Sequence, residues 1–404
     1  MYNNEIHTAG YILQSIKLPW QTILRVKKFV VWILVVIALV FGSITNSFSV
    51  ADAKSGGEKV RVLAESDEQS SAAVELGCQV VRETKGLKAL FCDPEDASIL
   101  GLKEDIRLFA VDTGANSQIK ANTVQASGNN GSGTRIVILD SGYNYNHPDL
   151  SQSYVAGYDF VNGDNNPLDD NGHGSHVAGL ITSDGIYSAA KGVAPGAGII
   201  AGKVLDSAGS GFFSDIVAAI YWAVDGPDGV YGTSDDFDAD AISMSLGTSP
   251  PYTYNGFCDF AMPSMTQAIS YAVSKDIVVV VAAGNSGRSG VSIPGCISYS
   301  TTVGAVSSSD KIASFSGRGS AVDISAPGVS LISTWLGNGY ATASGTSMAT
   351  PVVSGTVALV KYSHPSYSAS QVESALFGNA KDLGKAGKDT SYGYGRVDAS
   401  LAVQ

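Results

Sequence analysis

Continuous apolar runs alternate with stretches of helical periodicity from about residue 114 to the end of the chain. Buried strands are predicted at 135–140, 199–204, 241–246, 277–283, 301–306 and 322–326. Helices are predicted between them, at 173–182, 213–224, 263–275, 346–363 and 369–379. Apolar strands that alternate with helices are typical of an α/β protein with a doubly wound, mostly parallel sheet flanked by helices.

The preceding segment, residues 54–113, has a different pattern. Short alternating runs predict strands at 59–64, 79–82, 87–91 and 106–111, and helices are predicted at 67–75 and 94–102. These elements fit a small α+β unit. Residues 114–133 are rich in Gly, Asn and Ser, which predicts a linker or an extended arm. The chain therefore divides into 54–113 and a large domain, 114–404.

The first 53 residues predict a targeting segment. Basic residues at 25–28 precede an uninterrupted apolar run at 29–41, and a small-x-small site ends at Ala53. This combination is typical of a secretory signal over residues 1–53. The alternative is a membrane anchor through residues 29–44, although a spanning helix needs about 20 apolar residues.

Charge and cysteine content narrow the class of protein. The net charge of −12 argues against nucleic acid as a partner. Four cysteines divide evenly, with Cys78 and Cys92 in the small unit and Cys258 and Cys296 in the large domain. In an exported protein this distribution predicts one disulfide in each unit, and buried free thiols are the alternative.

Ser347, within residues 345–351, is the candidate nucleophile of the chain. Small residues lead into it and an apolar helical run follows, so Ser347 is expected in the first turn of a helix. Unpaired backbone N–H groups there stabilise negative charge on an attacked carbonyl oxygen. Pro351 is expected in the same first turn, where its missing N–H has no cost. The alternative is that Ser347 only caps the helix.

Two further motifs supply a base and a carboxylate. Asp140 ends a predicted strand, and His173 stands in a Gly-rich stretch just before a predicted helix. A serine hydroxyl becomes a nucleophile when an imidazole takes its proton and a carboxylate orients that imidazole. Asp169 and Asp170 are alternative carboxylates, but both lie in the loop directly before His173.

In these motifs, and in Asn285 within 281–287, the chain resembles the subtilase family of serine peptidases from about residue 130 to its end. The resemblance implies a catalytic Asp140, His173 and Ser347, with the Asn285 amide and the Ser347 backbone N–H as oxyanion hole. It also implies recognition of an extended substrate chain along two strand edges and a pocket. The matching positions are Ser210, Gly211, Ser245, Leu246, Gly247, Ala283 and Gly284.

The resemblance further implies a secreted, monomeric endopeptidase acting on protein and peptide substrates. The uncharged pocket predicts broad specificity for apolar or aromatic side chains, with Arg288 at the rim as an alternative attraction for acidic ones. Residues 54–113 are then a pro-segment, acting as chaperone and inhibitor of a zymogen and removed by self-cleavage between roughly 105 and 125. A narrow processing peptidase and a non-catalytic binding protein are the alternatives.

No cofactor is expected for catalysis, and calcium is the metal to consider. The acidic residues of 225–240 and Asp149, which matches a calcium ligand of many family members, suggest a structural Ca²⁺. A solvated acidic loop is the alternative. His176 lies one helical turn from His173, which in isolation suggests a metal pair, but no Glu lies between the two as in zinc peptidases.

Overall fold

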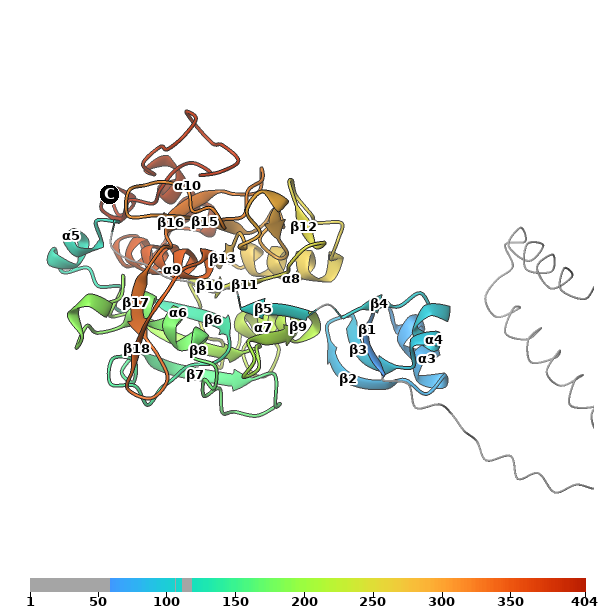
Figure 1. Ribbon diagram of the computed structural model, residues 1–404. Helices are drawn as coiled ribbons and strands as arrows, with labels where there is room; N and C mark the ends of the chain where they lie inside the picture. Colours follow the sequence, from blue (N-terminus) through green and yellow to red (C-terminus); the bar gives the residue numbers. More distant parts are fainter. Residues whose placement is uncertain (1–58, 106, 111–117) are drawn as a thin grey trace, which may run out of the picture. The chain divides into compact units, whose positions relative to one another are not determined.

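The structure is a computed structural model that describes residues 59–105, 107–110 and 118–404 (Figure 1). The predicted signal or anchor segment lies outside the described residues. Within the described ranges, no helix combines the length and apolar character needed to cross a bilayer.

A seven-stranded sheet organises the large domain, and every strand pairing in it is parallel. Its strand order is β16-β15-β13-β10-β6-β8-β7. In chain order these strands are β6 (Arg135–Asp140), β7 (Tyr154–Asp159), β8 (Gly198–Lys203), β10 (Ala241–Met244), β13 (Val278–Ala282), β15 (Thr301–Val306) and β16 (Ile324–Pro327). The predicted fold class is confirmed.

Helices cover both faces of this sheet (Figure 1). Ile136 and Ile138 pack in one core with α6 (His173–Thr182) and α9 (Thr346–Ser363), and α10 (Ala369–Gly378) joins them. Val137 and Leu139, which alternate with them along β6, pack in a second core with α7 (Phe213–Asp225) and α8 (Pro263–Ser274). Because both faces are buried, the central strands need the uninterrupted apolar runs seen in the sequence.

Only the strand β7 was missed in this sheet. It lies at the edge, and its residues are half-buried or exposed apart from Asp159. A half-exposed edge strand does not need an apolar run, so its sequence carries no strong signal.

The small unit has the predicted α+β elements. Its antiparallel sheet, in the order β2-β3-β1-β4, is formed by β1 (Val60–Ala64), β2 (Gln79–Thr84), β3 (Leu87–Cys92) and β4 (Lys103–Glu104). Its helices are α3 (Asp67–Glu75) and α4 (Pro94–Ile99). Ser66 caps α3 by accepting a hydrogen bond from the Gln69 N–H at 3.2 Å, and Cys78 and Cys92 form the expected disulfide.

Two expectations for the segment between these sheets are wrong. The strand predicted at 106–111 is β5 (Arg107–Ala110), but it does not join the small sheet, whose edge beside β1 is filled by β4. Instead it pairs with β9 (Ser210–Phe212) and β11 (Leu246–Gly247). The expected linker contains the helix α5 (Ala121–Ala126), because the buried Ala121 and Val124 join the core of the large domain.

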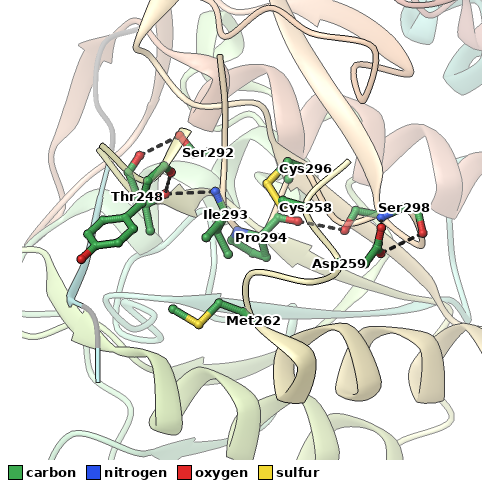
Figure 2. The surroundings of a disulfide bond; sticks show 12 residues. Thr248, Cys258, Asp259, Met262, Ser292, Ile293, Pro294, Cys296 and Ser298 are labelled. Carbon is green, nitrogen blue, oxygen red and sulfur yellow. Dashed lines mark hydrogen bonds between the residues drawn. A yellow bond between two sulfur atoms is a disulfide. The ribbon is translucent and has the colours of Figure 1, made fainter. Parts of the chain in front are cut away.

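The second expected disulfide joins Cys258 to Cys296 and anchors a long loop beside the sheet (Figure 2). The Cys258 N–H also donates to the Cys296 carbonyl at 2.9 Å. On one side, Asp259 accepts hydrogen bonds from the backbone and side chain of Ser298. On the other side, Ser292 Oγ donates to the Thr248 carbonyl at 2.7 Å. The loop is therefore fixed on both sides of the disulfide.

The remaining elements are short. They are the hairpin β17 (Leu331–Thr334) and β18 (Tyr340–Ala343), the pair β12 (Thr253–Tyr254) and β14 (Val291–Ser292), the helix α11 (Ala399–Ala402), and the 3₁₀ turns η1 (Ser188–Ala190) and η2 (Gly287–Ser289).

Candidate active site

The carboxyl ends of the parallel strands carry the residues predicted for catalysis. Asp140 is the last residue of β6, and Asn285 follows β13 by three residues. His173 is the first residue of α6, and Ser347 is the second residue of α9. Because parallel strands all end at one edge of a sheet, this connectivity places the site where such folds bind their ligands.

A buried hydrogen bond joins Asp140 and His173. Asp140 Oδ1 and His173 Nδ1 are 2.7 Å apart, with the two residues only 0% and 2% exposed. A carboxylate can only accept, so Nδ1 donates and Nε2 is left as the basic nitrogen of the ring. The Ser141 N–H also donates to Asp140 Oδ1 at 2.7 Å. An imidazole with the proton on Nδ1 and a lone pair on Nε2 is the tautomer that a general base needs.

Asp169, the alternative carboxylate, has a structural task. Its Oδ1 accepts from the Gly172 N–H and from Ser141 Oγ, both at 2.9 Å. Its Oδ2 accepts from the N–H and Oγ of Ser175. The carboxylate thus neutralises the N-terminus of α6, where His173 lies. Asp170 is paired with the buried Lys203 instead, at 2.6 Å.

Close approach of α6 to the end of β6 requires glycine. A Cβ on Gly174 would lie 2.1 Å from the Gly142 carbonyl oxygen, and Gly172 at the helix start has φ 104°. Both positions exclude other residues, the first by clash and the second by backbone strain.

Ser347 is held by a reciprocal pair of hydrogen bonds with Ser245. Ser347 Oγ donates to the Ser245 carbonyl at 3.1 Å, and Ser245 Oγ donates to the Ser347 carbonyl at 2.7 Å. Pro351 explains the second bond. It is the sixth residue of α9 and does not lie in the first turn as expected. A residue with an N–H at this position would donate to the Ser347 carbonyl, and proline cannot. The Ser245 hydroxyl replaces that lost helical bond.

The orientation of the Asn285 amide is fixed by Thr346. Asn285 Oδ1 accepts from the Thr346 N–H at 3.0 Å and from Thr346 Oγ1 at 3.1 Å. An N–H can only donate, so the atom facing Thr346 must be the amide oxygen. The Nδ2 donor is therefore turned to the other side of the partly exposed amide. Sequence reasoning missed Thr346 and Ser245 as supports of the site.

The two predicted substrate edges are already paired with β5. In the antiparallel register, Leu108 lies opposite Gly211 and Phe109 opposite Ser210 on one side. On the other side Phe109 lies opposite Gly247, and Ala110 lies opposite Leu246, next to Ser245. The chain therefore occupies the groove between these two edges with its own segment.

The walls of the predicted pocket come together around Ser292. A Cβ on Gly247 would lie 2.8 Å from the Ser292 Cβ, and one on Gly284 would lie 1.9 Å from the Ser292 Oγ. The segment at Ala283 and the edge at Gly247 are thus in contact through a single small residue, and glycine is required on both sides of it.

His176 does not have the surroundings of a metal ligand. Its Nε2 faces the carbonyl oxygens of Leu331 and Ala341 at 3.2 and 3.1 Å, and since a carbonyl can only accept, Nε2 carries a proton and donates. Burial, with His173 nearby, lowers the pKa of His176 to about 4.

The residues suggested for calcium accept hydrogen bonds from other groups of the chain. Asp149 is buried, and its carboxylate accepts from the Ile186 N–H at 2.8 Å and the Tyr340 hydroxyl at 2.7 Å. In the acidic loop, Asp235 and Asp236 accept from backbone N–H groups at 2.9 and 2.6 Å. Among the described residues no group of three or more possible metal ligands occurs, so calcium stays a prediction without support at either place.

Comparison with known proteins points to one family. The family model described as the subtilase family matches residues 131–395. Subtilisin E of Bacillus subtilis (strain 168) is 34% identical over 407 residues, which cover 94% of this chain and 100% of that protein. Subtilisin DY of Bacillus licheniformis is 39% identical over 290 residues, 71% of this chain and 96% of that protein. An alkaline protease of Alkalihalobacillus alcalophilus is 34% identical over 357 residues, 86% of each.

The buried His176 predicts a loss of stability in acid. Its pKa of about 4 lies below the unfolded value of 6.5, so between these values the unfolded chain binds the extra proton. Stability therefore falls as the pH drops from 6.5 to 4, by about 3 kcal/mol at the lower end. We expect His176→Gln to reduce the change of the melting temperature with pH over this range. The variant is made in a Ser347→Ala chain, which cannot digest itself. An unchanged slope would show that His176 is not responsible.

Proposed function

The chain belongs to the subtilase family and is a serine endopeptidase; on this premise we propose that it is exported, has broad specificity and removes its own pro-segment. The observation that carries the proposal is the pairing of β5 between β9 and β11. An extended peptide with a partner on both sides is the form in which this family is expected to hold a substrate.

Each catalytic residue has a role that its surroundings support. Ser347 Oγ attacks the carbonyl carbon of the substrate, and His173 Nε2 takes the proton that the hydroxyl loses. Asp140 keeps the imidazole in its tautomer and stabilises the imidazolium that forms. His173 then gives the proton to the leaving amine, and water repeats the sequence on the acyl-enzyme.

Negative charge on the attacked oxygen is stabilised by two donors. One is the Ser347 backbone N–H, at the N-terminal turn of α9, and the other is Asn285 Nδ2. Since Thr346 fixes the amide through Oδ1, the Nδ2 donor is oriented before the substrate arrives. Donors that need no reorganisation give the largest electrostatic benefit in acyl transfer.

Recognition of the substrate is dominated by its main chain. Pairing with Ser210, Gly211, Leu246 and Gly247 uses backbone groups that every peptide has, which favours broad specificity. The pocket walls near Ala283 and Gly284 carry no charge, which favours apolar or aromatic side chains. A narrow processing peptidase remains the alternative within the family.

The segment 59–105 is proposed as the inhibitory part of the pro-segment. Asp105 is buried and accepts from the N–H of Ser214 at 3.1 Å and from its Oγ at 2.7 Å, which caps the N-terminus of α7. Arg61 bridges Asp105 and Asp215 at 2.7 and 3.0 Å, and Arg82 also reaches Asp215 at 2.9 Å. Burial raises the pKa of Asp105. These contacts hold β5 in the substrate groove.

Self-cleavage is proposed directly after β5, between Ala110 and the domain boundary at residue 114. The register places Ala110 opposite Leu246, the residue next to Ser245, whose carbonyl accepts a hydrogen bond from Ser347 Oγ. Export by the predicted signal over residues 1–53 would precede this step.

Asn285→Ala is expected to lower kcat by about 10²–10³ with little change in KM, a magnitude taken from the asparagine of subtilisin itself. The reason is that the lost Nδ2 donor acts on the transition state more than on the bound substrate. Steady-state hydrolysis of a chromogenic peptide measures both constants. If KM rose while kcat stayed constant, Asn285 would be a binding residue instead.

Ser347→Ala is expected to leave the precursor uncut, because no nucleophile remains to cleave the bond after β5. Intact mass and N-terminal sequencing should place the start of the wild-type product between residues 111 and 114 and that of the variant near Lys54. Ser370→Ala, which changes an exposed serine of α10, is the matched control and should mature normally. Normal maturation of Ser347→Ala would mean that another peptidase makes the cut.

A further inference from the structure

Two arginines of the large domain line a pocket that the catalytic residues do not use. Arg288 and Arg318 border it together with Asn255, Gly319, Thr390 and Ser391, and its volume is about 390 Å³. Four separate segments of the chain form its walls.

The positive charge in this pocket is not neutralised. In the ranges that the structure describes, no carboxylate lies within 4.0 Å of either guanidinium. The Nε of Arg318 is buried and has no hydrogen-bond partner among the described residues. A buried donor without an acceptor is costly, and since Arg318 is only partly buried and Arg288 is exposed, both guanidinium groups are open to an acceptor from outside the chain.

Asp389 and Asp323 are hydrogen-bonded or ion-paired to other groups. Asp389 accepts from the N–H groups of Lys385, Ser391 and Tyr392 at 2.7–2.9 Å, which holds the loop it belongs to. Asp323 is paired with Lys388 at 2.7 Å. Neither carboxylate is free to turn toward the arginines without breaking these bonds.

Main-chain hydrogen bonds fix the walls of the pocket. The Arg318 N–H donates to the Gly287 carbonyl at 3.1 Å, and the Gly319 N–H donates to the Thr390 carbonyl at 2.9 Å. The Ser320 N–H donates to the Asn255 carbonyl, also at 2.9 Å. The two guanidinium groups are thus attached to a rigid frame that also presents hydroxyl and amide groups.

We propose that this pocket binds an oxyanion between Arg288 and Arg318, with inorganic phosphate, sulfate or a carboxylate as its chemical class. The planar fork of each guanidinium matches the oxygen spacing of such groups. The two arginines come from segments far apart in sequence, so one bound oxyanion would join them as a non-covalent cross-link.

Such a cross-link would act on the loop that carries Asn285. The Gly317 N–H donates to the Gly284 carbonyl at 2.7 Å, and the Gly287 N–H donates to the Phe315 carbonyl at 2.7 Å. The segment that ends in Arg318 therefore already contacts both sides of this loop, and an anion would fasten it to Arg288. The bound anion stabilises the folded chain by mass action.

Inorganic phosphate is the probe for the test, added to the full-length Ser347→Ala chain at constant ionic strength set with NaCl. We expect saturating phosphate to raise the melting temperature by about 2 °C or more. Arg318→Gln and Arg288→Gln should each abolish the shift. Lys311→Gln, which removes one charge from an exposed residue, should retain it. No shift in the parent chain, or the same shift in Arg318→Gln, would overturn the proposal.

Kinetics of the mature enzyme identify the source of the oxyanion. If the site takes the carboxylate of a peptide, phosphate should inhibit competitively, and Arg288→Gln should selectively raise KM for peptides with an Asp in place of Asn. If it takes a free anion, phosphate should raise the melting temperature without affecting KM. Both results support an oxyanion site, whereas Arg288 and Arg318 variants indistinguishable from the parent in both assays would contradict it.

Discussion

The hydrogen bond between Asp140 and His173 is the interaction on which the arrangement of the site depends. Both groups are buried, so the bond forms only if the end of β6 and the start of α6 are brought into close contact. Gly174 allows that contact, and Asp169 accepts hydrogen bonds from the unpaired N–H groups at the start of α6. A small shift of either element would leave a buried carboxylate without its partner, which is costly.

The second half of the site is positioned by residues that follow β10 and β13 and by the start of α9. Thr346 fixes Asn285, and Ser245 exchanges hydrogen bonds with Ser347 where Pro351 interrupts the helical pattern. Ser245 lies between β10 and β11, so the strand that pairs with a peptide is tied directly to the proposed nucleophile. The two hydrogen bonds between Ser245 and Ser347 thus hold the peptide-binding strand and the proposed nucleophile together. β5 pairs with this strand, which agrees with the proposal that one segment is first the substrate and then the inhibitor.

Much of this fold could be predicted because buried parallel strands need apolar runs. Asp140 and Asn285 could be placed at the carboxyl ends of two such strands, and the roles proposed for them came from the motifs of the family. The partners of β5 could not be predicted, because pairing between distant segments leaves no mark on the local pattern of β5 itself. The edge strand β7 and the short helix α5 could not be predicted, because half-exposed or short elements have a weak periodicity of apolar residues.

The same limit applies to the polar groups of the site. A proline four residues after Ser347 was the only signal of the Ser245 bond, and it was placed in the wrong helical turn. The hydrogen bonds that Asp149 accepts from Ile186 and Tyr340 could not be predicted, because the proximity of these residues depends on the folded chain.

Labelling with a fluorophosphonate tests most directly whether Ser347 is a nucleophile activated by His173 and Asp140. Attack by Ser347 Oγ forms an oxygen–phosphorus bond and releases fluoride, and intact mass followed by peptide mapping locates the adduct. We expect one adduct per mature chain, on Ser347, formed far more slowly in Asp140→Asn because the imidazole loses its oriented tautomer. An adduct at another residue, or equal labelling rates in the wild type and in Asp140→Asn, would contradict this assignment.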